Sequence, residues 1–206
     1  MDPTSPISSL IPSLDAAVLE VLAVADRPLG VSQIQRSTRR GARSGVHRVL
    51  DRLVIHGLVE ARPSNVGSVY LLNTEHVLVP AVMSAVRAWS ELVSRLTAAC
   101  EALEPAVVAA ALHGAAARRE AGPESPLELV LIVGDDHLVS AEWDRQLRDL
   151  DDRVRTWSGN RLERVVLTEH HLQELADAGE PILDAWRRDA IVLVGKRTFD
   201  FPDARL

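Results

Sequence analysis

One group of residues whose types could carry chemistry lies between residues 113 and 129, in the stretch HGAAARREAGPESPLEL. Two carboxylates separated by one residue on a strand point to the same face, where together they can hold a divalent metal ion against phosphate. Glu128 stands on a predicted strand, and the position two residues before it is Pro126. Because the proline side chain binds no metal, this pair of strand positions offers a single carboxylate, that of Glu128.

A second group of charged residues is basic and lies between residues 31 and 62. It holds seven arginines against only two acidic residues, Asp51 and Glu60. The arginines are Arg36, Arg39, Arg40, Arg43, Arg48, Arg52 and Arg62. The whole chain has a net charge of −6, so one short segment is basic inside an acidic protein. Because a guanidinium group can bind guanine edges or phosphate oxygens in pairs, the pattern predicts contact with nucleic acid.

Length and composition indicate a globular chain with one large or two small domains. The 206 residues are 47% hydrophobic and 25% charged, which is enough apolar material to form a core. The single cysteine, Cys100, excludes an internal disulfide framework and a cysteine-based zinc cluster. We expect no bound metal and no cofactor. The sequence has no secretory apolar segment and no membrane-length apolar run, so we also expect a cytoplasmic protein without membrane contact.

The elements that position the basic segment follow from the spacing of apolar residues. Residues 1–12 contain three prolines and predict a flexible leader. Apolar positions recur at intervals of three and four over residues 14–25, which is typical of one face of a helix. Further helices are predicted up to residue 38 and over residues 44–56. Two strands, residues 58–62 and 68–72, follow around a reversing loop that contains proline, asparagine and glycine.

This order of helices and hairpin, over residues 13–75, resembles the winged helix-turn-helix domain of bacterial transcriptional regulators. The runs VSQI from residue 31, SGVHRVLDRL from residue 44 and IHGLV from residue 55 carry the resemblance. It implies that the third helix enters the major groove of double-stranded DNA while the hairpin contacts the neighbouring backbone. The residues it implies to face DNA are Arg43, Ser44, Gly45, His47 and Arg48. Those it implies to neutralise phosphates are Arg39, Arg40, Arg52 and Arg62. The alternative is a solvated basic face on a domain that binds only protein.

A long linker helix is predicted over residues 76–103. Its apolar seam comprises Val86, Trp89, Val93, Leu96, Cys100 and Leu103. An unpaired helix of this length leaves apolar surface in water, so the seam predicts a homodimer through residues 77–103. The alternative is a helix that packs on the domains of its own chain.

Residues 104–196 change to alternating strands and helices. Strands are predicted over residues 106–112, 127–133, 161–167 and 191–194, and helices over residues 141–157, 169–178 and 181–188. Together with the stretch from residue 113, this order resembles the minimal nucleotidyltransferase family, in which Gly-Ser, Ala-Arg-Gly and Ser-Asp-x-Asp bind nucleotide and metal. The expected fold class is α+β: an N-terminal winged helix-turn-helix, a linker helix, and a C-terminal nucleotidyltransferase-like α/β sheet domain. A tail over residues 197–206 follows.

The chain departs from this family at several positions of the same site. Ala115 stands in place of the serine, Arg119 in place of the last glycine, and Pro126 in place of the first aspartate. Glu128 takes the second carboxylate position, and Glu163 corresponds to a third. Transfer by two metal ions needs several carboxylates and close backbone approach at once, so these departures imply an inactive domain.

A residual ligand site is still expected in the C-terminal half. Its candidate residues are Gly114, Ala115, Arg118, Ser125, Glu128 and Glu163. Backbone N–H groups of the turn and the Arg118 guanidinium attract anions, so a nucleotide or another small effector is the predicted ligand.

The sequence therefore predicts a sequence-specific, DNA-binding transcriptional regulator with an inactive nucleotidyltransferase-like domain that serves assembly or ligand sensing. One alternative is an active, metal-dependent nucleotidyltransferase that uses Glu128 and Glu163, with the winged domain presenting a substrate. Another is an antitoxin-like protein that binds a second chain.

Overall fold

The structure is a computed structural model that describes residues 1–65, 67–136 and 140–195. Helices and strands are mixed, and the described strands form two separate sheets, which confirms the α+β class. The chain divides into two compact units, residues 4–89 and residues 90 onward, here called the N-terminal and C-terminal units. The division falls within residues 76–103, the segment predicted as a linker. The predicted tail, residues 197–206, lies outside the described residues.

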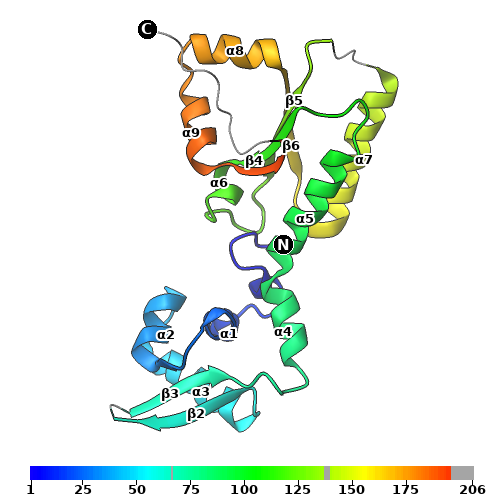
Figure 1. Ribbon diagram of the computed structural model, residues 1–206. Helices are drawn as coiled ribbons and strands as arrows, with labels where there is room; N and C mark the ends of the chain where they lie inside the picture. Colours follow the sequence, from blue (N-terminus) through cyan, green and yellow to red (C-terminus); the bar gives the residue numbers. More distant parts are fainter. Residues whose placement is uncertain (66, 137–139, 196–206) are drawn as a thin grey trace. The chain divides into compact units, whose positions relative to one another are not determined.

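The N-terminal unit packs helices against a small antiparallel sheet (Figure 1). The helices are α1 (Leu14–Val24), α2 (Val31–Thr38) and α3 (Arg43–Ile55), close to their predicted bounds. The strands are β1 (Leu29–Gly30), β2 (Val59–Ser64) and β3 (Gly67–Leu72), in the order β1-β3-β2. Ile34, Val46 and Leu50 are fully buried at the centre of the core. β1 escaped the sequence prediction because two residues are too few to display an alternation of apolar and polar positions.

The predicted flexible leader is wrong, because the residues before α1 are folded onto the unit. Pro6–Ser9 form a 3-10 helix, and the Ile7 side chain is completely buried in the core. The Asp2 carboxylate accepts hydrogen bonds from the backbone N–H groups of Thr4 and Ser5, at 2.9 and 3.1 Å. Proline and serine are typical of loops in general, but here Ile7 and the partly buried Ile11 pack this segment against the core.

Two glycines shape the contact between α1 and α3. Gly41, before α3, has a φ of +73°, and Gly45 lies in the first turn of the helix. A Cβ atom at residue 41 would approach Leu14 Cδ2 to 2.9 Å, and one at residue 45 would approach the same atom to 3.2 Å. A side chain at residue 45 would therefore face Leu14 of α1, and the contact of Gly45 with DNA stays a prediction.

Gly41→Ala should destabilise the N-terminal unit by about 1–2 kcal/mol, because only glycine adopts a left-handed conformation without strain. Gly45→Ala is the matched control. It adds the same methyl group beside Leu14, but within a helix, where alanine is favoured over glycine by about 1 kcal/mol. Native-state amide exchange in α3 measures both effects. Equal destabilisation by the two substitutions would contradict the assignment of the cost to the backbone of residue 41.

The long linker helix is interrupted. α4 (Val79–Val86) and α5 (Ala88–Glu101) are separate helices, and Arg87 between them is not helical. Most of the predicted dimer seam is already buried within the chain: Leu96 and Cys100 are 0% exposed and Leu103 is 3% exposed. Their burial favours the alternative in which this segment packs on its own chain, and it leaves the homodimer without the support that the seam offered.

The C-terminal unit is built on a four-stranded mixed sheet in the order β6-β5-β4-β7. The strands are β4 (Ala109–His113), β5 (Leu127–Val133), β6 (Leu162–Thr168) and β7 (Ile191–Val194). β5 pairs in parallel with β6, and β4 runs antiparallel to both of its neighbours. β5 has nearly continuous apolar sequence because it is an inner strand with both faces covered.

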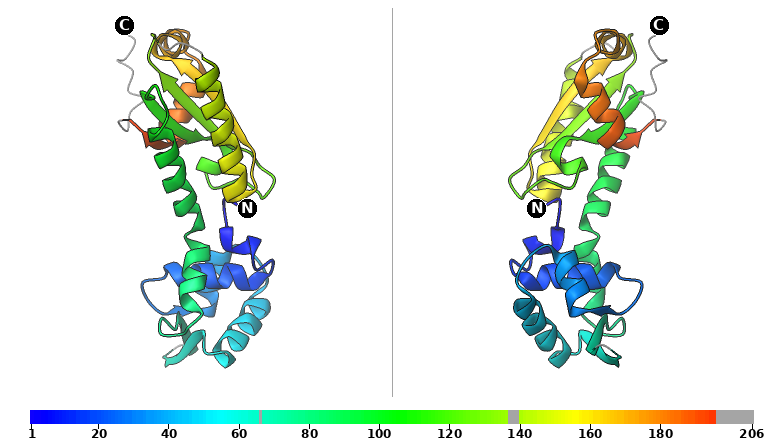
Figure 2. Two further views of the ribbon diagram at one scale, coloured as in Figure 1. Left: turned by 90° about the vertical axis from the view of Figure 1, so that its right-hand side faces the viewer. Right: turned by 90° about the vertical axis from the view of Figure 1, so that its left-hand side faces the viewer.

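Helices cover the two faces of this sheet. α8 (Glu169–Asp177) and α9 (Pro181–Asp189) lie on one face, and α7 (Ala141–Ser158) and α5 lie on the other (Figures 1 and 2). Val130 and Ile132 of β5 pack with Trp186 of α9 in one core cluster. Side chains two residues apart on a strand share a face, so Glu128 points to the α8–α9 side as well.

In the part of the chain that the structure describes, no helix combines the length and the apolar character needed to cross a bilayer.

Candidate functional site

The outer surface of α3 carries the residues predicted to read DNA. Arg43, Ser44, His47 and Arg48 are all exposed. His47 Nδ1 lies 3.0 Å from Asp51 Oδ2, one turn further along the helix. Within residues 1–65, 67–136 and 140–195, no carboxylate pairs with Arg43 or Arg48. Both guanidinium groups are therefore open to a polyanion.

The turn before α3 adds two further exposed arginines. Arg39 ends α2 in a left-handed conformation with a φ of +52°, and Arg40 follows it. The Thr38 hydroxyl donates a hydrogen bond to the Arg40 carbonyl oxygen at 3.0 Å, which fixes the backbone of the turn. The turn thus presents Arg39 and Arg40 beside the N-terminal end of α3.

Two other predicted phosphate contacts are engaged within the chain. Arg52 forms an ion pair with Asp15 of α1, and the Asp15 side chain is only 17% exposed. Arg62 on β2 donates to Glu60 of the same strand at 2.8 Å. Arg52 therefore links α3 to α1, and Arg62 shares its charge with a neighbour on its own strand.

The two units differ in charge. Residues 4–89 contain nine arginines and six acidic residues, a net charge of +3. Residues 90–206 contain 14 basic and 22 acidic residues, a net charge of −8. The attraction for a polyanion is concentrated in the N-terminal unit.

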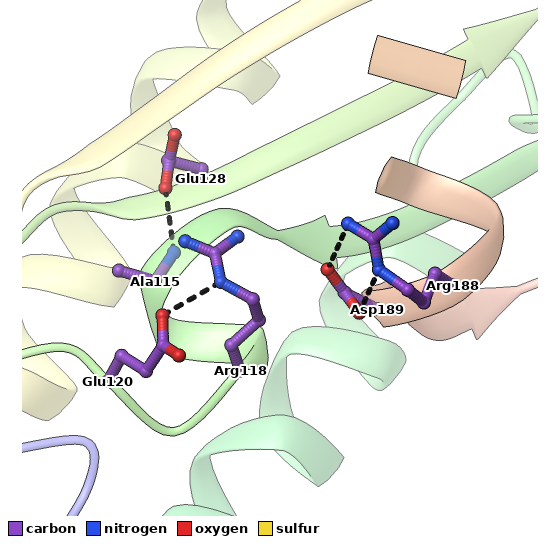
Figure 3. Close-up of polar contacts among 6 residues, drawn as sticks. All are labelled: Ala115, Arg118, Glu120, Glu128, Arg188 and Asp189. Carbon is purple, nitrogen blue, oxygen red and sulfur yellow. Dashed lines mark hydrogen bonds and ion pairs between the residues drawn. The ribbon is translucent and has the colours of Figure 1, made fainter. Parts of the chain in front are cut away.

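The predicted ligand turn lies at the end of β4. There α6 (Gly114–Ala117) starts directly after His113, and Gly114 has a φ of +69°. Glu128 faces Gly114 so closely that any side chain at residue 114 would overlap its carboxylate. The Ala115 backbone N–H donates to Glu128 Oε2 at 3.3 Å, as Figure 3 shows. Glu128, which the nucleotidyltransferase resemblance implies to be a metal ligand, is thus turned toward the backbone of its own chain.

Arg118 also has a partner within the chain. Its Nε donates to Glu120 Oε2 at 2.8 Å (Figure 3). This hydrogen bond raises the pKa of Arg118 above its ordinary value, and the guanidinium stays charged. Arg118 thus belongs to a local ion pair, which lowers its value as an anion receptor.

A cavity of about 320 Å³ opens beside this turn. It is lined by His113, Gly114, Ala115, Arg118, Glu128, Ile182, Ala185, Trp186 and Asp189. The strands contribute His113 and Glu128, which are paired in register on β4 and β5, and α9 contributes the apolar wall. Asp189 at the end of α9 pairs with Arg188 at 3.1 Å (Figure 3).

His113 is the unusual polar group of the cavity. Its Nε2 atom is buried without a hydrogen-bond partner among the described residues. The imidazole ring stacks at a tilt on Trp186, with ring centroids 5.3 Å apart. Burial lowers the pKa of His113 below its ordinary value of 6.5, although the nearby Glu128 opposes the shift. The imidazole is neutral at pH 7.

The C-terminal unit should therefore lose stability as the pH falls through 6.5, the ordinary pKa of the imidazole. The unfolded state binds a proton at His113 more readily than the folded state, so acidification favours unfolding. Stability measured between pH about 7.5 and about 5.5, on both sides of that value, should fall less in His113→Phe than in the unmodified chain. An identical pH dependence of the two proteins would contradict the neutral, buried imidazole.

Two predicted members of the ligand site lie elsewhere. The Ser125 hydroxyl accepts a hydrogen bond from the Gly122 N–H at 3.0 Å and does not line the cavity. Glu163 is paired in register with Glu128 on the neighbouring strand, but its side chain is exposed. Its Oε1 atom lies 3.7 Å from Arg161 Nη2. Among the described residues, no group of three His, Cys, Asp or Glu side chains converges to hold a metal ion.

Sequence reasoning missed the residues that build the cavity wall and hold the preceding loop. Trp186 and Asp189 are about 60 residues along the chain from Glu128, at a distance that local patterns do not link. Asn160 is only 2% exposed, and its amide donates to the carbonyl oxygens of Pro123 and Ser125, both at 3.1 Å. The local sequence marks Asn160 only by its position directly after Gly159, the glycine that caps α7.

Comparison with known proteins adds no relative. The chain matches no protein-family model, no curated protein and no solved structure.

Proposed function

We propose that this protein is a DNA-binding transcriptional regulator. Its N-terminal unit acts as a winged helix-turn-helix, and its C-terminal unit is an inactive nucleotidyltransferase-like domain that senses a ligand or supports assembly. The observation that carries the proposal is the exposure of Arg43 and Arg48 on α3, which form no ion pair with the residues that the structure describes. Arg39 and Arg40 lie in the turn before this helix.

The arrangement of the N-terminal unit supports this role. α2 and α3 are joined by a turn of four residues, and β2 and β3 form an antiparallel hairpin after α3. In proteins that bind DNA in this way, the exposed face of the second of two such helices reads base edges, and groups around it bind phosphates. Four of the arginines suited to these contacts remain free of intramolecular ion pairs in the described residues.

The C-terminal turn supports an inactive domain. Close approach of a phosphate to Gly114 and Ala115 requires an uncovered backbone, and here the Glu128 carboxylate covers it. Pro126 supplies no oxygen ligand at the position before Glu128 on the same face. These features weaken phosphate and metal binding together.

The test is selection of duplexes from a random-sequence library by the full-length chain, followed by gel-shift titration. We expect one sequence pattern to be enriched, and we expect its affinity to fall steeply with salt concentration as counterions are released. A library that stays random after repeated rounds would overturn the proposal.

A further inference from the structure

The cavity beside Gly114 has an excess of negative charge. Glu128 forms no ion pair with an arginine or lysine in the described part of the chain. Asp189, whose side chain is 17% exposed, is balanced by the exposed Arg188, and Arg118 is balanced by Glu120. Glu128 is thus the carboxylate of the cavity without a direct ion pair among the described residues, and Arg118 in the same lining attracts it only through space.

The same contacts make the cavity a poor site for an anion. A phosphate bound at the turn would need the Ala115 N–H, which already donates to Glu128. It would also have to approach Gly114 where the Glu128 carboxylate lies, and two negative groups in contact repel strongly in a partly buried site. The ligand class predicted from the sequence, a nucleotide, fits these contacts badly.

The rest of the lining suits a ligand with one charged and one apolar end. His113 contributes its imidazole ring, which lies at a tilt against Trp186 with ring centroids 5.3 Å apart. Trp186, Ala185 and Ile182 form an apolar wall on α9. The volume of about 320 Å³ lies at the small end of the range for small-molecule sites.

We propose that this cavity binds a small organic cation, an amine that carries an apolar group. The ammonium group lies against Glu128, and the apolar part packs on Trp186 and Ile182. The inference rests on the proposed ligand-sensing role of the C-terminal unit, and it names the class of ligand that this unit senses.

Calorimetric titration of the full-length chain, without DNA, tests the charge preference. The probes are benzylamine, benzyl alcohol and benzoate, which share an aromatic ring and differ in charge, and ATP with Mg²⁺ as the nucleotide. Each is added at up to about 10 mM, where small fragments bind measurably. We expect benzylamine to bind at least about tenfold more tightly than benzyl alcohol, because a hydrogen bond between two charged groups is stronger than a neutral one. Absence of benzylamine binding, or equal or tighter binding of benzoate or of ATP with Mg²⁺, would overturn the proposal.

Glu128→Gln locates the site. The glutamine amide oxygen can still accept from Ala115 N–H, so the turn keeps its hydrogen bond while the charge is lost. Benzylamine should then bind about tenfold more weakly, with benzyl alcohol unchanged. The matched control is Glu142→Gln on the exposed face of α7, which should leave both affinities as they are. Unchanged benzylamine affinity in a folded Glu128→Gln chain, with its circular dichroism preserved, would place the amine elsewhere and refute the site.

The outcome is separable from that of the DNA experiment. If benzylamine binds as expected and no duplex is enriched, the regulator proposal fails and the cation site stands. If a duplex is enriched and benzylamine does not bind, the cation site fails alone.

Discussion

Replacing Arg43 and Arg48 together by alanine should weaken binding of the selected duplex by about a hundredfold at physiological salt, since an arginine that binds a base or a phosphate in this way contributes about 1–3 kcal/mol. Both side chains are exposed on α3 and free of intramolecular ion pairs among the described residues, so their removal takes away contacts to DNA and little else. Gel-shift titrations at several salt concentrations measure the effect. For each arginine–phosphate interaction that the substitutions remove, the slope of log affinity against log salt should become shallower by about 0.9.

The matched control for this pair is Arg145→Ala with Arg148→Ala. These arginines are exposed on α7 of the acidic C-terminal unit, and their loss removes the same charge from the chain. Affinity should change little in the control, because a Debye length of about 8 Å screens remote charges. Equal weakening in both double variants would mean that only net charge matters, and it would remove α3 as the reading helix.

Asn160→Ala should lower the free energy of unfolding of the C-terminal unit by about 1–3 kcal/mol, because the two part-buried hydrogen bonds of its amide are lost. The acceptors are the carbonyl oxygens of Pro123 and Ser125, in the loop that leads into β5 and Glu128. Because the chain has two units, a single free energy of unfolding for the whole chain is not well defined. Native-state amide exchange in β5 reports on the C-terminal unit by itself.

Asn65→Ala serves as the control for Asn160. Asn65 is exposed at the tip of the β2–β3 hairpin, and its removal should change stability by less than about 0.5 kcal/mol. Exchange in β5 that is as slow in Asn160→Ala as in the unmodified chain would show that the loop is held by other contacts.

Most helices and strands were predictable because their signals are local. The apolar run of β5 and the spacing of Leu147, Leu150 and Val154 on α7 reflect burial that repeats with the period of each element. Ile7 shows where this reasoning ends. The few apolar residues of a segment rich in proline and serine show no sustained period, and only the fold shows that Ile7 is buried.

The exposed arginines illustrate the same division within one helix. The sequence places Arg43, Arg48 and Arg52 on α3, but it does not reveal that Arg52 forms an ion pair with Asp15 on α1. Gly45 is likewise turned toward Leu14, because the packing of α1 on α3 decides which face of the helix is covered.

By itself the sequence determined the α+β class, the positions of most elements, the basic segment and the absence of an acid at Pro126. These follow from composition and from neighbours along the chain. The tertiary structure decided that Glu128 covers the Gly114 turn and that His113, Trp186 and Asp189 share one cavity. The reason is physical: a cavity is made by side chains from strands and helices far apart in sequence, and their meeting depends on how the sheet is ordered and covered, which no local pattern encodes.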